Sequence, residues 1–235
     1  MSVNVSPPRS TTKVSFYGGA IEAELNINYK DVSEVRPVPD HQEVYISHYT
    51  LAQGVEASVS LIIEILDPAS IPASAEGTMN GAIMYYFEDI VETNEADSFE
   101  VLSQFSQVSS DSFGTFMPSM EATFSRFALV GKQRGCASTA NEKDVDIILV
   151  LVRLANVGTD ILFTLHVPTS LQFADSHTAE KLVSGIEGIG GDSSGMMMMD
   201  VQDKESTESL GEKIASDFRT LLDTFKIVDW SLFST

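Results

Sequence analysis

Apolar and polar positions alternate along several short stretches of the chain, as expected for β-strands with one buried face. These strand-like stretches are Ala20–Asn26, Glu43–Ser47, Val59–Leu66, Phe99–Val108, Glu121–Val130, Val145–Leu154 and Asp160–Val167. Within them, Ile147–Val152 is apolar at every position, which is typical of a central strand buried on both faces. Short connections such as Asn156–Gly158 favour hairpins and an antiparallel sheet. Phe225–Asp229 could add a last short strand.

Two other stretches repeat apolar residues at the period of an α-helix. The spacing predicts one helix from about Thr78 to Val91 and a second from about Ser209 to Thr224. Their apolar stripes are Met79, Ile83, Tyr86, Phe87 and Ile90 in the first, and Leu210, Ile214, Phe218, Leu221, Leu222 and Phe225 in the second. Ser209 and Glu212 match a capping box, which fixes where the second helix begins.

The remaining segments are polar or rich in Gly, Pro and Ser. Residues 1–12 are expected to form a disordered arm, and Leu171–Val183 has room for a short helix. Loops or turns are expected at Tyr29–Asp40, Ile71–Gly77, Ser109–Ser119, Gly131–Ala137 and, as a mobile insert, residues 185–209. One helical turn fits at Val32–Arg36 before two prolines stop it. We therefore predict one α+β domain over residues 13–235, with helices packed on a sheet of about six strands.

The charge balance limits the partners that the surface can attract. The chain has 34 acidic and 14 basic residues, a formal net charge of −20. Such a surface repels phosphate backbones and anionic membranes but attracts basic proteins, although acidity alone also keeps a protein soluble. A single cysteine, Cys136, a polar N-terminus and no apolar run long enough to span a bilayer favour a cytosolic or nuclear protein.

The sequence contains no arrangement of residues typical of an enzyme. Phosphate-binding loops, nucleophile elbows and zinc spacings are missing, and the four histidines are scattered along the chain: His41, His48, His166 and His177. The adjacent carboxylates of Glu88 and Asp89 diverge on the surface of the predicted helix and cannot share a substrate atom. We therefore expect no catalytic residue, no cofactor and no metal.

The segment Asp31–Tyr45 is the most unusual in the chain. Two prolines stiffen it, and it carries four carboxylates, Asp31, Glu34, Asp40 and Glu43. A stiff acidic loop entering a strand can hold carboxylates toward the basic groups of a partner. On its own, however, such a segment is more often a solvated turn capped by its aspartate.

The same segment resembles the signature of the Ran guanine nucleotide release factor (Mog) family. The matching stretches are Gly18–Ile21, Asp31–Ser33 and Pro39–Tyr45, and the resemblance continues in order through Ser60–Leu66, Tyr86–Asp89, Gly131–Gln133, Leu151–Leu154, Thr159–Leu162 and Phe218–Phe233. One departure is His41, which stands where the family usually has Asn and could become charged near pH 6. Three inserts, Ala69–Gly77, Ser109–Ser119 and residues 185–209, also lengthen this chain.

The resemblance implies an α/β/α sandwich with a curved antiparallel sheet, the Mog/PsbP-like fold. It implies binding to the small GTPase Ran and release of its guanine nucleotide, supporting nuclear import. Partner contacts carry over to Asp40 and Glu43, with Asp31, Glu34, Gln42 and His41 as flanking candidates. We expect a monomer in the nucleus and cytoplasm. The alternative is an acidic scaffold or trafficking adaptor that binds basic proteins without nucleotide release.

Overall fold

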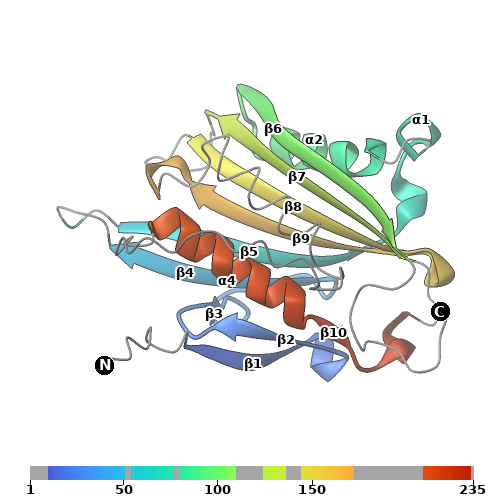
Figure 1. Cartoon of the computed structure of the whole chain (residues 1–235), viewed down its shortest axis with the longest axis horizontal. Helices are drawn as coiled ribbons and strands as arrows, with labels where there is room; N and C mark the ends of the chain where they lie inside the picture. The colour runs from blue at the N-terminus through green and yellow to red at the C-terminus, as the bar shows by residue number, and fades with distance from the viewer. Residues whose placement is uncertain are drawn as a thin grey trace, which may run out of the picture.

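The computed structural model describes residues 10–50, 54, 56–76, 80–109, 124–135, 144–171 and 209–233. Its centre is a seven-stranded sheet in which every neighbouring pair is antiparallel, in the order β3-β4-β5-β9-β8-β7-β6 (Figure 1). These strands are β3 (Lys30–Asp31), β4 (Gln42–Thr50), β5 (Glu56–Leu66), β6 (Ser98–Ser109), β7 (Phe124–Arg134), β8 (Asp144–Leu154) and β9 (Thr159–Pro168). The predicted antiparallel sheet is confirmed.

A second, three-stranded sheet has the order β1-β2-β10. Its strands are β1 (Thr11–Phe16), β2 (Ile21–Asn26) and β10 (Lys226–Ile227). Our prediction of a single sheet of about six strands therefore missed this layer. The reason is that β1 and β10 are short and gain their stability from pairing with β2, which their own sequence patterns do not reveal. Strand β1 also begins inside the predicted arm, at Thr11.

The two main helices lie on opposite faces of the large sheet (Figure 1). Helix α2 (Gly81–Thr93) buries Ile83, Tyr86 and Phe87 against one face, and α4 (Leu210–Thr224) packs between the other face and the small sheet. The capping box of α4 is present as predicted, with the Ser209 hydroxyl accepting from the Glu212 N–H at 3.2 Å. Each Val, Leu, Ile or Phe side chain that is fully buried in these two cores contributes about 1.5–3 kcal/mol to folding.

The apolar run in β8 is buried on both faces, as predicted for a central strand. Its residues alternate between the two cores, with Ile148 and Val150 facing α4 and Leu149 and Leu151 facing α2. This central position explains why the strand is apolar throughout, and it makes β8 the frame on which both helices are placed.

Three local predictions were wrong. The predicted loop Ile71–Gly77 contains the short helix α1 (Ala73–Glu76), and the loop Tyr29–Asp40 begins with the two-residue strand β3. The predicted turn at Gly131–Ala137 begins too early, because β7 continues to Arg134 by pairing with β6 and β8. The predictions for Ser109–Ser119, Leu171–Val183 and residues 185–209 fall largely outside the described residues.

Candidate functional site

The six predicted contact residues lie where β3 leads through a turn into β4, a region that we call the acidic corner (Asp31, Glu34, Asp40, His41, Gln42 and Glu43). The turn is held by Val32, whose backbone N–H donates to the Val44 carbonyl at 2.8 Å. The Val32 carbonyl in turn accepts from the N–H groups of Val35 and Arg36, at 2.9 and 3.0 Å, which confirms the predicted helical turn. The backbone of the corner is thus fixed before any partner arrives.

Asp40 and Glu34 extend their side chains into solvent. Within the described residues neither carboxylate forms an ion pair or a side-chain hydrogen bond. Asp31 is half-buried, and its Oδ1 accepts from the Ser33 N–H at 2.7 Å, a local turn that fixes the direction of the side chain. The carboxylates of Asp40 and Glu34 are therefore available to a partner, whereas that of Asp31 is held by its own turn.

Glu43 is more enclosed. Its Oε1 accepts a 2.6 Å hydrogen bond from the backbone N–H of Tyr17, in the turn that joins β1 and β2. Burial raises the pKa of the Glu43 carboxyl, the Tyr17 N–H opposes this rise, and the nearby charge of Asp31 adds to it. Because these influences on the pKa come from burial, a backbone dipole and another carboxylate, a positive group from outside would stabilise the ionised form.

Tyr17 links the small sheet to the corner through its side chain as well. Its backbone has φ of 50°, and its hydroxyl lies within hydrogen-bond distance of the carbonyl oxygens of Ile63, at 2.8 Å, and His41, at 3.1 Å. Burial raises the pKa of the Tyr17 phenol, and the charge of Glu43 raises it further. The phenol therefore remains a neutral hydrogen-bond donor that joins both sheets at the corner.

Gln42 takes the opposite direction from Glu43, because neighbouring side chains on a strand alternate between the two faces. Its Nε2 donates to Oε1 of Glu64 on β5 at 2.6 Å. Burial raises the pKa of Glu64, while Gln42 and the nearby His41 lower it. His41 is exposed beside this pair. The structure thus groups Asp31 with Glu43 and places Gln42 on the other face.

The described residues contain no group of three or more His, Cys, Asp or Glu side chains arranged to hold a metal ion. None of the helices in the described ranges combines the length and apolar character that are needed to cross a membrane. What the acidic corner does combine is exposed carboxylates with a fixed backbone, an arrangement suited to docking the basic surface of another protein.

A sequence model of the family described as "Ran-interacting Mog1 protein" matches residues 14–168 of the chain, from β1 through β9. This chain belongs to the Ran-interacting Mog1 protein family. The matched region includes the whole acidic corner and both of its supports, Tyr17 and Glu64.

Curated relatives of the Mog1 family align over most of the chain. A Dictyostelium discoideum protein named "Probable ran guanine nucleotide release factor" is 26% identical over 94% of this chain and 95% of its own length. The Homo sapiens "Ran guanine nucleotide release factor" is 32% identical over 67% of this chain and 76% of its own. The Saccharomyces cerevisiae "Nuclear import protein MOG1" is 25% identical over 72% of each chain.

The crystal structure of the Saccharomyces cerevisiae Ran-binding protein Mog1p has the same fold. It superposes with a TM-score of 0.57 at 20% identity, covering 95% of this chain and 98% of that one. The predicted Mog-like α+β architecture is therefore confirmed.

Sequence reasoning missed two residues that shape the corner of this Mog1 family member, Tyr17 and Glu64. Glu64 lies between apolar residues in its strand, so a partner for its charge could have been sought. Tyr17 precedes two glycines in a predicted turn, but nothing in the sequence indicates that its N–H faces a carboxylate 26 residues later.

Proposed function

We propose that this chain binds the small GTPase Ran through the acidic corner and promotes release of its guanine nucleotide, supporting nuclear protein import. The proposal takes its partner from the names of the human and yeast relatives. In this account the chain is a binding protein without a catalytic residue, acts as a monomer in the nucleus and cytoplasm, and binds neither nucleic acid nor membrane.

The observation that supports the corner as the docking surface is the environment of Glu43. Its carboxylate is half-buried and held by a backbone N–H rather than by a cation, and the Asp31 charge disfavours its ionised form. A lysine or arginine from a partner would pair with the buried carboxylate and would offset the repulsion from Asp31. Asp40, exposed at the entrance to β4, would attract that cation and speed the encounter.

Thermodynamic linkage supplies the mechanism. A protein that binds nucleotide-free Ran more tightly than nucleotide-bound Ran lowers the affinity of Ran for its nucleotide by the same factor. A hundredfold effect needs about 2.7 kcal/mol of differential binding. A desolvated charge pair can contribute that much, whereas a solvent-exposed pair mostly changes the association rate. We assign the first role to Glu43 and the second to Asp40.

The proposal is tested by the release of a fluorescent GDP analogue from Ran. The wild-type chain should accelerate release, and the combined Asp40→Ala and Glu43→Ala substitutions should abolish most of the acceleration. Glu24→Ala is the matched control, because it removes an exposed carboxylate from the small sheet, away from the corner. No acceleration by the wild-type protein would refute nucleotide release, and equal acceleration by both proteins would refute the site.

The alternative remains an acidic scaffold or trafficking adaptor that binds basic proteins without releasing nucleotide. It is favoured by His41, which is exposed beside Glu64 and stands where the family usually has Asn, so the corner of this chain departs from the family pattern. A chain that binds Ran in pull-downs at several pH values, yet leaves nucleotide release unchanged, would select this alternative.

A further inference from the structure

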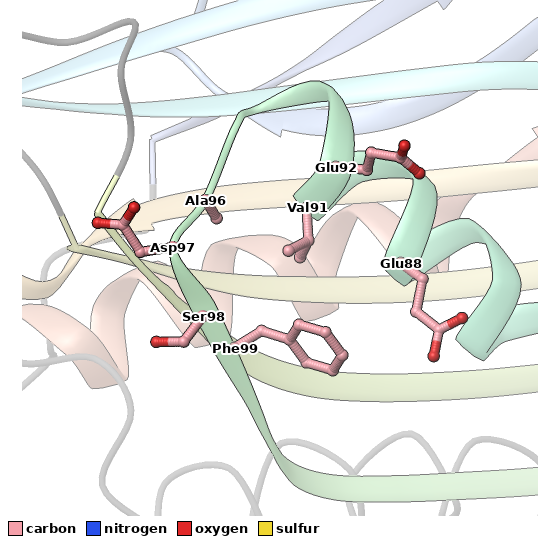
Figure 2. A pocket seen from close by; sticks show the side chains of 7 residues that line it. All are labelled: Glu88, Val91, Glu92, Ala96, Asp97, Ser98 and Phe99. Carbon is pink, nitrogen blue, oxygen red and sulfur yellow. The ribbon is translucent and has the colours of Figure 1, made fainter.

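A second acidic surface lies between the C-terminal half of α2 and the start of edge strand β6, away from the acidic corner. An open groove of about 610 Å³ is lined there by Glu88, Val91, Glu92, Ala96, Asp97, Ser98 and Phe99. Figure 2 shows the carboxylates of Glu88, Glu92 and Asp97 on different sides of the apolar side chains of Val91 and Phe99. We call this surface the Phe99 groove.

Phe99 contributes a solvent-exposed apolar surface to the groove. Its side chain is 45% exposed, among the most exposed large apolar groups of the described residues. The ring is supported from one side, because it packs edge-to-face on the buried Phe87 with 5.5 Å between ring centroids. Phenylalanine is one of the aromatic residues that are enriched in protein interfaces.

The charges around Phe99 are not compensated within the described residues. Glu88, Glu92 and Asp97 are exposed and form no ion pair with a described residue. The cations on the facing stretch of β7 are engaged elsewhere: Lys132 lies 4.0 Å from Asp146, and Arg134 lies 2.9 Å from Asp144. The groove therefore presents a net negative field around an apolar surface.

This arrangement weakens the helix that carries it. Glu88 and Glu92 are four residues apart, a spacing at which like charges repel. Both lie in the C-terminal half of α2, where the helix dipole is also negative, and the last turn has no basic residue. A cation bound in the groove would reduce this repulsion. No described residue forms an ion pair with Glu88 or Glu92 that would do the same.

From these observations we infer that the Phe99 groove is a second binding site, for an extended basic peptide segment that carries one large apolar side chain between lysines or arginines. The apolar side chain would cover Phe99 and Val91, and the flanking cations would pair with Glu88, Glu92 and Asp97. A nucleic acid or a second copy of this chain, with its net charge of −20, would be repelled by the same carboxylates. The inference is independent of Ran binding at the corner.

The test uses the full-length chain and two fluorescein-labelled synthetic peptides, one with a central leucine flanked by lysines and one with alanine in place of that leucine. Fluorescence anisotropy should give tighter binding of the leucine peptide. Phe99→Ala should weaken the leucine peptide by about fivefold or more and remove the difference between the two peptides. Val228→Ala, which truncates a similarly exposed apolar residue (42%), is the matched control and should have no effect.

The carboxylates are tested by combining Glu88→Gln and Glu92→Gln. Peptide affinity should fall, while the melting temperature of the free protein should rise because the repulsion along α2 is removed. A folding defect would lower both quantities, so the two outcomes are distinguishable. Glu24→Gln, which keeps an acceptor for the Thr11 hydroxyl, controls for net charge and should change neither quantity appreciably.

Three results would overturn the inference. One is unchanged binding of the leucine peptide by Phe99→Ala. Another is a loss of affinity per carboxylate removed that is the same in Glu24→Gln and in the Glu88 and Glu92 double variant, which would mean attraction to the net charge alone. Peptide binding that is lost in Asp40→Ala with Glu43→Ala, and retained in the groove variants, would likewise reassign the peptide to the acidic corner.

Discussion

The Glu43 carboxylate accepts a 2.6 Å hydrogen bond from the backbone N–H of Tyr17, a residue of the small sheet 26 positions earlier in the chain. This contact joins the turn after β1 to the start of β4, and the Tyr17 hydroxyl strengthens the junction by reaching the Ile63 carbonyl at 2.8 Å. The carboxylate proposed to receive a cation from Ran is therefore also part of the structure that fixes the corner.

Replacing Glu43 should separate these two roles. Glu43→Ala leaves the Tyr17 N–H without its acceptor and should lower the free energy of unfolding by about 1 kcal/mol. Glu43→Gln keeps an oxygen acceptor and should be at least as stable as the wild type, while still losing the charge used in binding. Urea denaturation measures the free energy of unfolding of the two variants. An equal loss in Glu43→Ala and Glu43→Gln would mean that the hydrogen bond to the Tyr17 N–H contributes little.

The ionisation of Glu43 predicts a specific pH dependence. Its pKa in the folded protein is raised above the ordinary value of 4.5, mainly by burial, so the folded state binds more protons than the unfolded state between these two values. The contribution of Glu43 to stability should therefore improve as the pH falls through its raised folded-state pKa toward 4.5. Unfolding free energies at several pH values should show wild type gaining on Glu43→Gln over this range; a constant difference would contradict the shift.

The buried carboxylate of Asp160 should contribute strongly to the stability of the fold. It is fully buried and accepts from Nε and a terminal nitrogen of Arg153, each at 2.8 Å, and from the Tyr86 hydroxyl at 3.0 Å. Asp160→Ala would leave the arginine without its partner and should cost about 3–5 kcal/mol. Tyr86→Phe, which removes only the hydroxyl, should cost about 1 kcal/mol in the same denaturation experiment. Similar small losses of stability in Asp160→Ala and Tyr86→Phe would mean that Asp160 does not balance the charge of Arg153.

Gly131 allows α2 to approach β7 closely. A Cβ atom at this position would lie 2.8 Å from Cε2 of Phe87 and 3.1 Å from the Glu100 carbonyl oxygen. Gly131→Ala should therefore destabilise the protein by about 1–3 kcal/mol. Adding Phe87→Leu, which shortens the obstructing side chain, should recover part of that loss in a double-mutant cycle. Additive losses would show that the two positions do not compete for space.

Gly131 also explains one limit of prediction from the sequence. A glycine followed by polar residues is typical of a turn, yet β7 continues through it by pairing with β6 and β8, and the Phe87 ring occupies the space of the missing side chain. The two helices and the apolar strand Ile147–Val152 were predictable, because the spacing of apolar residues within each segment indicates which face is buried. Strand β10 was predicted from Phe225–Asp229, but its pairing with β2 depends on residues about 200 positions away.

The acidic corner was predictable in position but not in detail. Two prolines and four carboxylates within a short segment indicate a stiff charged turn, and the structure places Asp40 and Glu34 in solvent. That Glu43 is half-buried against Tyr17, and that Gln42 faces Glu64 on the other side of the strand, depends on the packing of the two sheets. The pattern of residues within the segment does not indicate how the two sheets pack against each other.

The proposed nucleotide release depends on a preference for nucleotide-free Ran that the acidic corner creates. Isothermal titration of the wild-type chain against nucleotide-free Ran and against GDP-bound Ran measures it directly. We predict tighter binding to the nucleotide-free form, and a smaller preference when Asp40→Asn and Glu43→Gln are combined, since these changes remove charge but retain the hydrogen bond to Tyr17. Equal affinity of the wild-type chain for the two forms of Ran would contradict the account.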